Sequence, residues 1–341
     1  MDFAVVGGGF TGLAAAAWLK RLAPEKSVAL LEGETFGAGA SGHTGGLALA
    51  ESAAGNLPGL GDVLSGYQKI LGELRVDGDL HLPGVYELGR TRPLKGAPIH
   101  WSDSGELCAV SEVAGGTIDP GKVVTGLAAA AERAGVLLFE HADVDRCKFG
   151  SPIEIHASLG ILYAAQVLFA TNAFSLELTG WKQRAEPCFT IAVATEPLPD
   201  ATLEEVGLGE GKPFYTVDLP YLWGRLLGKQ IIFGSGLVHV ADWRELHSLN
   251  IETGEAAGAF TRLETRIRKL HPKFRGVNFT HRWGGPIAIS EGWVPIFERH
   301  AQSANAIVLG GFSGHGVAQS VYLGAWAAEA LLGKRELPKW K

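Results

Sequence analysis

The first 32 residues constrain the fold of this chain more than any other stretch. Residues 3–6 (FAVV) form a short apolar run typical of a buried parallel strand. The turn GGGFTG follows, and residues 11–23 predict a helix that stops at Pro24. SVALLE then predicts a second strand that ends in Glu32. A strand, a glycine turn, a helix and a second strand in this order are typical of a βαβ dinucleotide-binding unit.

The spacing of the glycines assigns a role to each of them. Gly7, Gly9 and Gly12 match the pattern G-x-G-x-x-G. The first glycine allows a tight turn, the second lets a pyrophosphate approach, and the third packs the helix against the sheet. The free N–H groups at the start of the helix supply an anion site. Glu32 stands where it can accept hydrogen bonds from ribose hydroxyls, which a purely structural glycine turn would not require.

Two further glycine-dense loops favour FAD over NAD. ASGHTGGL (residues 40–47) follows the ribose acid, and GGFSGHG (residues 310–316) opens onto a helix. An NAD domain seldom needs a second glycine loop at this place, whereas FAD is longer and continues past the first loop. A helix N-terminus beside the pyrimidine end of a flavin would stabilise the anionic reduced ring. We therefore expect FAD as the cofactor.

The rest of the chain predicts a second domain. The 341 residues suggest about two domains. An amphipathic helix is expected at 62–75, and a second helix after Asp119 as N-cap with Pro120 at its first position. A polar helix is expected at 255–270. Residues 181–286 carry most of the aromatic residues and strand-like runs such as TIAVATE and QIIFGSGL.

Composition and charge exclude several classes of function. The net charge of −6 and the absence of a long Lys/Arg run argue against a nucleic-acid partner. Three isolated cysteines fit neither a disulfide framework nor a CxxC metal site, so no metal centre is expected. No apolar stretch approaches the roughly 20 residues that span a bilayer. Because a strand begins almost at Met1, no leader is expected, and a cytoplasmic location follows.

In this order, the motifs resemble those of the D-amino-acid oxidase-like FAD-dependent oxidoreductases, in particular the branch of glycine/sarcosine oxidases and gamma-glutamylputrescine oxidoreductases. The segments that carry the resemblance extend over nearly the whole chain: VVGGGFTGLAAA, FGAGASGHTGG, IDPGKVVTGLAAAAERAG, VLFATNAFS, TEPLPD and GGFSGHGVAQS. The resemblance implies an α/β fold with a discontinuous Rossmann-like FAD-binding domain and a smaller α+β substrate domain whose sheet is largely antiparallel. The expected boundaries are 1–50, 116–180 and 287–341 for the FAD-binding domain, and 51–115 and 181–286 for the substrate domain.

The same resemblance, together with the glycine motif, implies a set of cofactor-binding residues. Val144 would contact the adenine through its backbone, and residues 170–172 would lie near the ADP half. The expected set is Gly7, Gly9, Phe10, Thr11, Gly12, Glu32, Gly33, Ala40, Ser41, Gly42, His43, Gly46, Leu47, Val144, Ala170, Thr171, Asn172, Gly310, Gly311, Ser313, Gly314, His315, Gly316 and Val317.

The reaction implied by the resemblance is oxidation of a carbon–nitrogen bond in a small amine or amino acid. A neutral amine would lose hydride from its α-carbon to flavin N5, and the imine would then hydrolyse. Two alternatives stay open: a 2-hydroxy-acid dehydrogenase on the same fold, and a flavin-bearing subunit or binding module that needs a partner chain. The stretch 47–115 is short for this branch, which favours the partner and raises the alternative of an abbreviated active-site lid.

Two departures from the family pattern concern the flavin itself. Sarcosine oxidase-like members tether flavin through a cysteine shortly before the final strand, and EGWVPIFERHAQSANAIV contains none. Those members also use a lysine to promote reaction with oxygen, and Ile232 is expected at its place. We therefore expect a dehydrogenase with an electron acceptor other than O2, whose identity the sequence leaves unknown.

Five residues are candidates for positions facing flavin or substrate. His43 is either a covalent tether, as in dimethylglycine dehydrogenase-like relatives, or a non-covalent neighbour of the flavin, or a turn residue; we expect non-covalent FAD. His315 is expected to form a hydrogen bond at the flavin end. Arg225 and Arg282 are each either a carboxylate clamp or a surface or domain-interface arginine. Tyr221, together with Trp223 and Trp283, is either an aromatic wall for an amine or part of the core.

Overall fold

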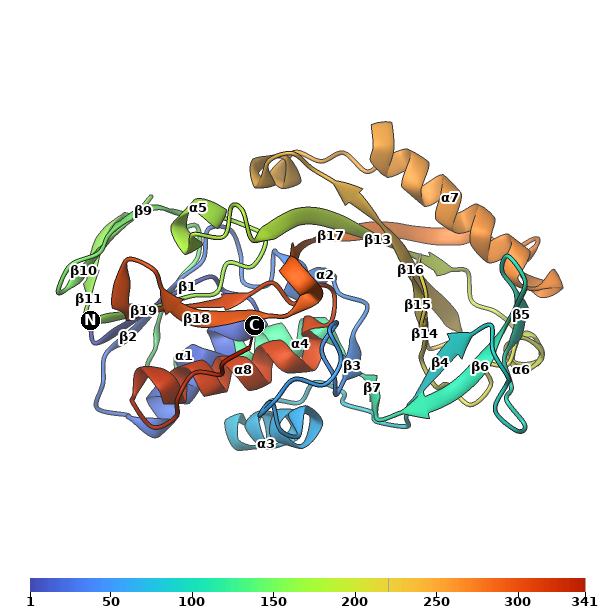
Figure 1. Cartoon of the computed structure of the whole chain (residues 1–341), viewed down its shortest axis with the longest axis horizontal. Coiled ribbons are helices and arrows are strands. Elements are labelled where there is room, and N and C mark those ends of the chain that lie inside the picture. Colours follow the sequence, from blue (N-terminus) through green and yellow to red (C-terminus); the bar gives the residue numbers. More distant parts are fainter. Residues whose placement is uncertain (220, 341) are drawn as a thin grey trace.

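The computed structural model describes residues 1–219 and 221–340. The molecule is elongated, with one large β-sheet towards each end and helices on the outer surface of each (Figure 1). The end that contains the N-terminus also contains the C-terminal helix, so the chain leaves this end and returns to it.

The first sheet has six strands in the order β18-β19-β12-β1-β2-β8. All neighbouring pairs are parallel except β18–β19. The strands are β1 (Phe3–Val6), β2 (Val28–Leu31), β8 (Leu137–Phe139), β12 (Gln166–Phe169), β18 (Ile296–His300) and β19 (Ser303–Gly310).

Alternation along β1 explains the layers around this sheet. Phe3 and Val5 share a hydrophobic core with a layer of helices, whereas Ala4 and Val6 share a second core with a three-stranded sheet. Successive side chains of a strand point to opposite faces, so an unbroken apolar run is needed where both faces are covered. The helices are α1 (Phe10–Leu22), α4 (Pro120–Arg133) and α8 (Gly316–Leu331), and the small sheet is β9 (Val144–Lys148), β10 (Ile153–Ala157) and β11 (Gly160–Ala164).

Helices α3 and α4 begin where their capping residues predict. Asp119 accepts a hydrogen bond from the Lys122 N–H at 3.0 Å, and Asp62 caps α3 (Val63–Leu74) by accepting from the Ser65 N–H at 3.0 Å. As expected for an amphipathic helix, the buried residues of α3 are all apolar: Val63, Leu64, Tyr67, Ile70, Leu71 and Leu74. They pack in the same core as α1 and α8, although α3 falls within the 51–115 stretch assigned to the substrate domain. The domain boundaries stay a prediction.

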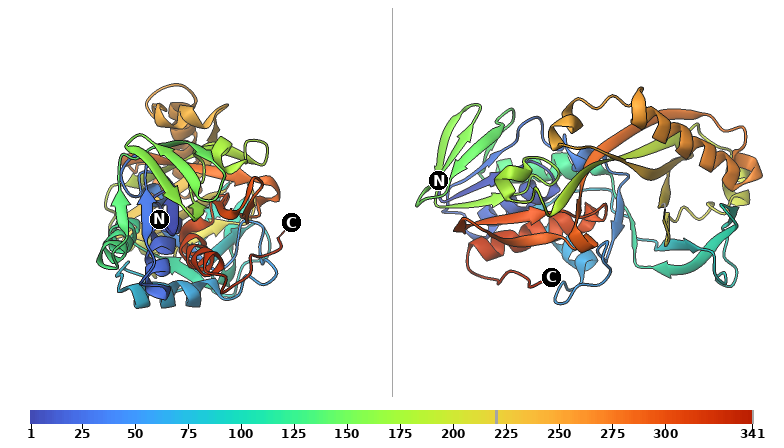
Figure 2. Two further views of the ribbon diagram at one scale, coloured as in Figure 1. Left: turned by 90° about the vertical axis from the view of Figure 1, so that its left-hand side faces the viewer. Right: turned by 45° about the horizontal axis from the view of Figure 1, so that its top comes forward.

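The second sheet has eight strands in the order β17-β13-β16-β15-β14-β4-β6-β5. Its neighbours are antiparallel except for β14–β4. Helix α7 (Gly254–Leu270) lies along its outer face (Figure 2). The strands are β4 (Val85–Gly89), β5 (His100–Ser102), β6 (Glu106–Val113), β13 (Ala185–Thr195), β14 (Phe214–Thr216), β15 (Leu222–Leu227), β16 (Gln230–His239) and β17 (Phe279–Ser290).

Short elements join the two sheets. Strands β3 (Leu47–Leu49) and β7 (Gly115–Thr117) pair between them.

Within the described ranges, no helix combines the length and the apolar character needed to cross a membrane. The remaining elements are α2 (Ala40–His43), α5 (Leu176–Thr179), α6 (Asp200–Glu205), η1 (Trp243–His247), η2 (Pro272–Phe274) and η3 (Glu291–Trp293).

Candidate cofactor and substrate site

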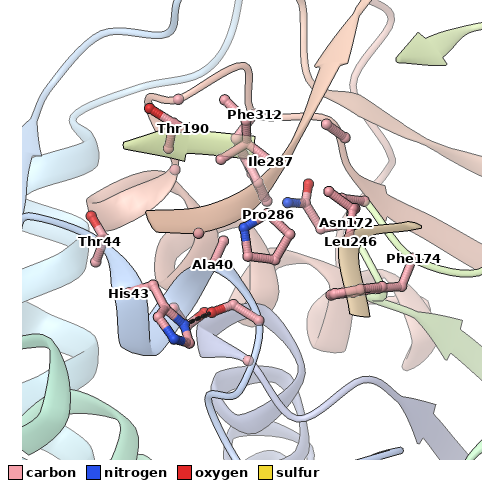
Figure 3. A pocket seen from close by; sticks show the side chains of 18 of the residues that line it. Ala40, His43, Thr44, Asn172, Phe174, Thr190, Leu246, Pro286, Ile287 and Phe312 are labelled. Carbon is pink, nitrogen blue, oxygen red and sulfur yellow. Dashed lines mark hydrogen bonds between the residues drawn. The ribbon is translucent and has the colours of Figure 1, made fainter. Parts of the chain in front are cut away.

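A cavity of about 1230 Å³ lies between the two sheets. It opens at the carboxyl ends of β1, β2 and β12, and its far wall is formed by β13, β15, β16 and β17. In Figure 3, His43 and Thr44 stand on one side of Pro286, and Asn172 and Phe174 on the other. Typical ligand pockets measure roughly 300–1,000 Å³. The cavity therefore has room for more than one ordinary small molecule.

The glycine turn after β1 is built for close approach. Gly7 has a φ of +106°, and a Cβ there would lie 2.6 Å from the carbonyl oxygen of Ala170. A Cβ on Gly12 would lie 1.9 Å from the carbonyl oxygen of Gly7. No side chain at the N-cap position caps α1, whose Phe10 N–H donates to Ser41 Oγ at 2.9 Å. The start of this helix thus faces the cavity, which suits an anion.

Glu32 is held in place by the turn it faces. Its Oε2 accepts from the Gly8 N–H at 2.6 Å, and its Oε1 accepts from the Glu34 N–H at 3.0 Å. Burial raises the pKa of Glu32, and the two backbone hydrogen bonds oppose that rise. Each carboxylate oxygen keeps a second lone pair. The carboxylate can therefore also accept hydrogen bonds from vicinal hydroxyls in the cavity.

Most of the residues expected at the cofactor are brought together on the cavity wall. Seven of the sequence candidates do not line it. The predicted residues that line it are Gly7, Gly9, Phe10, Thr11, Glu32, Gly33, Ala40, Ser41, His43, Leu47, Val144, Ala170, Thr171, Asn172, Tyr221, Ser313, Gly314, His315, Gly316 and Val317.

The five glycines that do not line the cavity allow close packing behind it. Gly12 packs on Gly7, and a Cβ on Gly42 would lie 2.5 Å from the Gly37 carbonyl oxygen. Gly46 has a φ of +77°. A Cβ on Gly310 would lie 3.0 Å from the Trp181 ring, and the Gly311 N–H donates to the Asn172 side chain. These glycines shape the loops instead of presenting backbone to a ligand.

The C-terminal glycine loop presents the start of α8 to the cavity. His315 stands at the N-cap position, and burial lowers the pKa of its imidazole. Its Nδ1 has no hydrogen-bond partner among residues 1–219 and 221–340, and the same holds for the buried Thr171 Oγ1. Buried polar atoms without partners are rare in proteins. Two such atoms on cavity-lining residues indicate a site whose hydrogen bonds a ligand completes.

His43 is exposed on the cavity wall at the end of α2. Its Nδ1 lies 2.9 Å from the Gly39 carbonyl oxygen, and its own carbonyl oxygen accepts from Trp283 Nε1 at 3.1 Å (Figure 3 shows the ring). Because a carbonyl oxygen can only accept, Nδ1 carries the proton and Nε2 presents a lone pair. The geometry is compatible with each of the three roles considered for this residue.

Neither candidate arginine lines the cavity. Arg225 is buried and donates to the carbonyl oxygen of Ile118 at 2.5 Å. It stands two residues after Trp223 in β15, and its side chain reaches the end of the β3–β7 pair instead of the cavity. Arg282 donates to Glu264 of α7 at 2.7 Å. It neighbours Trp283, which does line the cavity, so strand alternation points Arg282 to the opposite face of the sheet. Both guanidinium groups are thus engaged outside the cavity, and a carboxylate clamp by either residue stays a prediction.

An aromatic wall closes the end of the cavity formed by the eight-stranded sheet. Tyr221, Trp223 and Trp283, considered from the sequence, all line it, and Tyr215 and Trp293 join them. The Tyr215 hydroxyl is within hydrogen-bond distance of Glu87 Oε1, at 2.7 Å.

The segment η1 also lines the cavity, although none of its residues was a candidate from the sequence. Residues of η1 line the cavity, and Trp243 Nε1 donates to Glu177 Oε2 at 2.7 Å. His247 Nδ1 lies 3.0 Å from Glu34 Oε1, next to the ribose acid. Arg244 is the one lysine or arginine among the lining residues of the described chain, and it pairs with Glu177 and Asp242. No sequence signal points to this segment, since its contacts join stretches far apart in the chain.

Three observations show that these residues fit FAD. The glycines of the turns at residues 7–12 and 42–46 leave no space for side chains, two lining residues carry buried polar atoms without partners, and the cavity exceeds the volume of typical ligand pockets. None of the three cysteines lines the cavity in the part of the chain that the structure describes, and Ile232 does not line it either.

Comparison with known proteins points to the same cofactor. A family model described as "FAD dependent oxidoreductase" matches residues 2–330. The chain is 26% identical over 381 residues to the "Probable oxidoreductase OrdL" of Haemophilus influenzae, covering 98% of this chain and 84% of that protein. It is 25% identical over 382 residues to the "Gamma-glutamylputrescine oxidoreductase" of Escherichia coli, with the same coverage.

A solved structure shows the same fold. The structure of glycine oxidase from Geobacillus kaustophilus superimposes with a TM-score of 0.75 at 20% identity, covering 98% of this chain and 95% of that chain. The predicted fold class, with a Rossmann-like unit and a largely antiparallel second sheet, is confirmed.

Proposed function

The chain belongs to the family of FAD-dependent oxidoreductases, and on this premise we propose that it oxidises the carbon–nitrogen bond of a small amine. The family supplies FAD as the cofactor, and the similarity to a gamma-glutamylputrescine oxidoreductase supports amines or amino acids as the substrate class. The choice of an amine over an amino acid is the finer step, and it rests on the lining of the cavity.

The aromatic wall is the observation that carries the proposal. Tyr221, Trp223 and Trp283 offer ring faces, which attract an ammonium group or cover the apolar carbons of an amine. An α-carboxylate next to the reacting carbon would favour a bidentate arginine. Arg225 and Arg282 are engaged elsewhere, and Arg244 pairs with Glu177 and Asp242. The aromatic end thus suits a substrate without that carboxylate.

The chain's own residues position both reactants. The glycine turn, Glu32, the backbone of Val144, residues 170–172 and residues 313–317 would hold FAD, which supplies the acceptor for the hydride when bound. The aromatic side chains would orient the α-carbon of a neutral amine, so that orientation contributes most of the rate. The uncharged His315 ring and the start of α8 would stabilise negative charge at the flavin end. Water then hydrolyses the imine product.

An electron acceptor other than O2 belongs to the same proposal. In the described part of the chain no lysine lines the cavity, and Ile232 is buried in β16 away from it. We expect slow turnover with O2 and faster turnover with an artificial acceptor, measured at equal substrate concentration. Equal or faster turnover with O2 would contradict this part and leave amine oxidation standing.

The test of the proposal is anaerobic bleaching of the flavin by candidate substrates. Small primary and secondary amines should bleach the visible absorbance, α-amino acids should do so less efficiently, and 2-hydroxy acids should not. Bleaching by 2-hydroxy acids alone would favour the dehydrogenase alternative. A chain that binds FAD but is bleached by none of these compounds would favour a flavin-bearing subunit that needs a partner.

Two variants on neighbouring residues sharpen this test. Trp283→Leu should raise the half-saturating amine concentration by about 2- to 30-fold, the range expected from the loss of a cation–π contact. Arg282→Ala, on the opposite face of the same strand, should leave it unchanged. An equal effect of both variants would indicate a general disturbance of β17 and would remove the support from the aromatic wall.

A further inference from the structure

Three metal-ligating side chains converge at the β13–β16 pair of the eight-stranded sheet, where His239 lines the cavity. Strands β13 and β16 are antiparallel, and their register places Cys188 opposite His239. Glu186 stands two residues before Cys188 and therefore on the same face. One ligand atom from each of the three lies within 4.8 Å of the others.

The distances suit a tetrahedral metal site. Cys188 Sγ lies 3.6 Å from His239 Nδ1. Zinc–sulfur and zinc–nitrogen bonds of about 2.3 and 2.0–2.1 Å at a tetrahedral angle separate the two donor atoms by about 3.5 Å. His239 Nδ1 and Glu186 Oε1 are 2.6 Å apart, as in a hydrogen bond. With zinc–nitrogen and zinc–oxygen bonds of about 2.0–2.1 Å, these two atoms would have to be about 3.3 Å apart. The exposed Glu186 side chain can move by the difference.

A buried thiol and a close His–Glu pair each occur elsewhere in this chain, but at the β13–β16 site they occur together. Burial raises the pKa of the Cys188 thiol to about 12, as it does for Cys147, which stands in β9. A His–Glu pair also occurs at His156 and Glu154, at 2.5 Å. Sulfur, imidazole nitrogen and carboxylate oxygen meet together at the β13–β16 site, which is the donor set that zinc prefers.

We propose that Glu186, Cys188 and His239 bind one thiophilic divalent ion, for which Zn²⁺ is the best fit. Binding replaces the thiol proton by a sulfur–metal bond, and that proton passes to the solvent. The ring proton of His239 moves from Nδ1 to Nε2, so the imidazole stays neutral. No electron is transferred. Because His239 lines the cavity, the ion would sit in its wall, with its fourth position left for water or a ligand from the cavity.

The test is a metal titration of the flavin-loaded protein after removal of metals with a chelator. Co²⁺ should bind with a stoichiometry of one ion per chain and produce a near-ultraviolet thiolate-to-cobalt absorption in the difference spectrum, and Zn²⁺ should displace it. Cys188→Ser should abolish that absorption. Glu186→Gln and His239→Ala should each weaken binding at least tenfold, because even partners in the outer shell of a metal change its affinity roughly 10- to 100-fold.

The chain supplies matched controls. Cys147→Ser removes a half-buried thiol whose pKa is raised as far as that of Cys188, and His156→Ala removes an equally close His–Glu pair, so both should leave the titration unchanged. His239 is exposed, so His239→Ala separates loss of a ligand from misfolding; its melting temperature without metal should equal that of the wild type. Absence of saturable binding, or binding that Cys188→Ser and His239→Ala leave intact, would overturn the proposal.

Discussion

At the scale of single residues, His315 has a pKa that its surroundings clearly lower. Its ring stands at the start of α8, and burial lowers the pKa of the imidazole. The positive end of a helix dipole disfavours a cation at the same place. A neutral ring can still donate or accept one hydrogen bond from a ligand, so this histidine suits the flavin end of the cavity without acting as a charged group.

Lowering the pH should therefore reduce the free energy of unfolding, and His315 should account for part of this loss. Above the ordinary histidine pKa of about 6.5, both the folded and the unfolded chain hold the ring neutral. Below it, the unfolded chain binds a proton at this histidine, whereas the folded chain keeps the ring neutral. The free energy of unfolding therefore decreases as the pH falls, by at most about 1.4 kcal/mol per pH unit from this residue. Urea unfolding of the flavin-free protein between pH 7.5 and 5 measures this loss.

The variant His315→Asn isolates the contribution. Burial also lowers the pKa of His300, which contributes a loss of the same sign in both proteins. The difference in unfolding free energy between the wild type and His315→Asn should consequently shrink as the pH falls. A difference that stays constant over this range would show that the folded chain protonates His315 as readily as the unfolded chain does.

His43 decides whether the flavin leaves the protein on denaturation. We expect the yellow colour to pass a filter after denaturation, which is the outcome for non-covalent FAD with His43 only as its neighbour. The visible spectra of the retained chain and of the filtrate measure this directly. Colour that stays with the chain, and is lost in His43→Ala, would instead make the free Nε2 of His43 the point of attachment.

At the scale of elements, Gly12 allows helix α1 to pack closely against strand β1. Helix α1 passes so close to β1 that a Cβ at this position would lie 1.9 Å from the carbonyl oxygen of Gly7. By contrast, a Cβ on Gly72, inside α3, would meet no atom within 4 Å. The two glycines stand in helices of similar length, so they form a matched pair.

Gly12→Ala should impair both folding and cofactor binding, because α1 must move away from the strand that carries the glycine turn. Gly72→Ala should raise the unfolding free energy by about 0.5–1 kcal/mol, since alanine has the higher helix propensity. Urea unfolding and FAD titration of both variants check these outcomes. Normal FAD affinity in Gly12→Ala would mean that the helix and the turn adjust independently.

The segment η1 joins the two sheets across the cavity at the level of the whole molecule. It follows β16, and it reaches Glu34 through His247 and Glu177 through Trp243 and Arg244. Glu34 is two residues from the ribose acid Glu32 and donates its N–H to it. The segment thus covers the side of the cavity on which the ADP half of the cofactor would lie.

Loss of this contact should hasten release of FAD. His247→Ala removes an exposed side-chain contact with Glu34 whose worth is about 0.2–1 kcal/mol, so the dissociation rate should rise about 1.4- to fivefold. Recovery of flavin fluorescence after dilution measures that rate. His156→Ala, far from η1 on the small sheet, is the control and should leave the rate unchanged. Identical rates in the wild type and His247→Ala would show that η1 does not retain the cofactor.

Local sequence alone determined the elements whose signals lie within a few residues. The glycine turn, the start of α4 at Asp119 and Pro120, and the buried face of α3 all follow from spacing, capping and periodicity. These signals depend on backbone conformation and on contacts within one element, so neighbouring residues contain all the information. The resemblance to the family extended this reading to the fold and to FAD.

Tertiary structure alone decided which side chains face the cavity. Trp283 faces it and Arg282 does not, because adjacent residues of a strand point to opposite faces and only the packing of α7 shows which face is which. Arg225 faces the same way as Trp223 but lies beyond the cavity edge, under β3 and β7. The contacts of η1 and the meeting of Cys188 with His239 join residues distant in the chain. Such neighbourhoods arise only when strands pair, which no short stretch of sequence specifies.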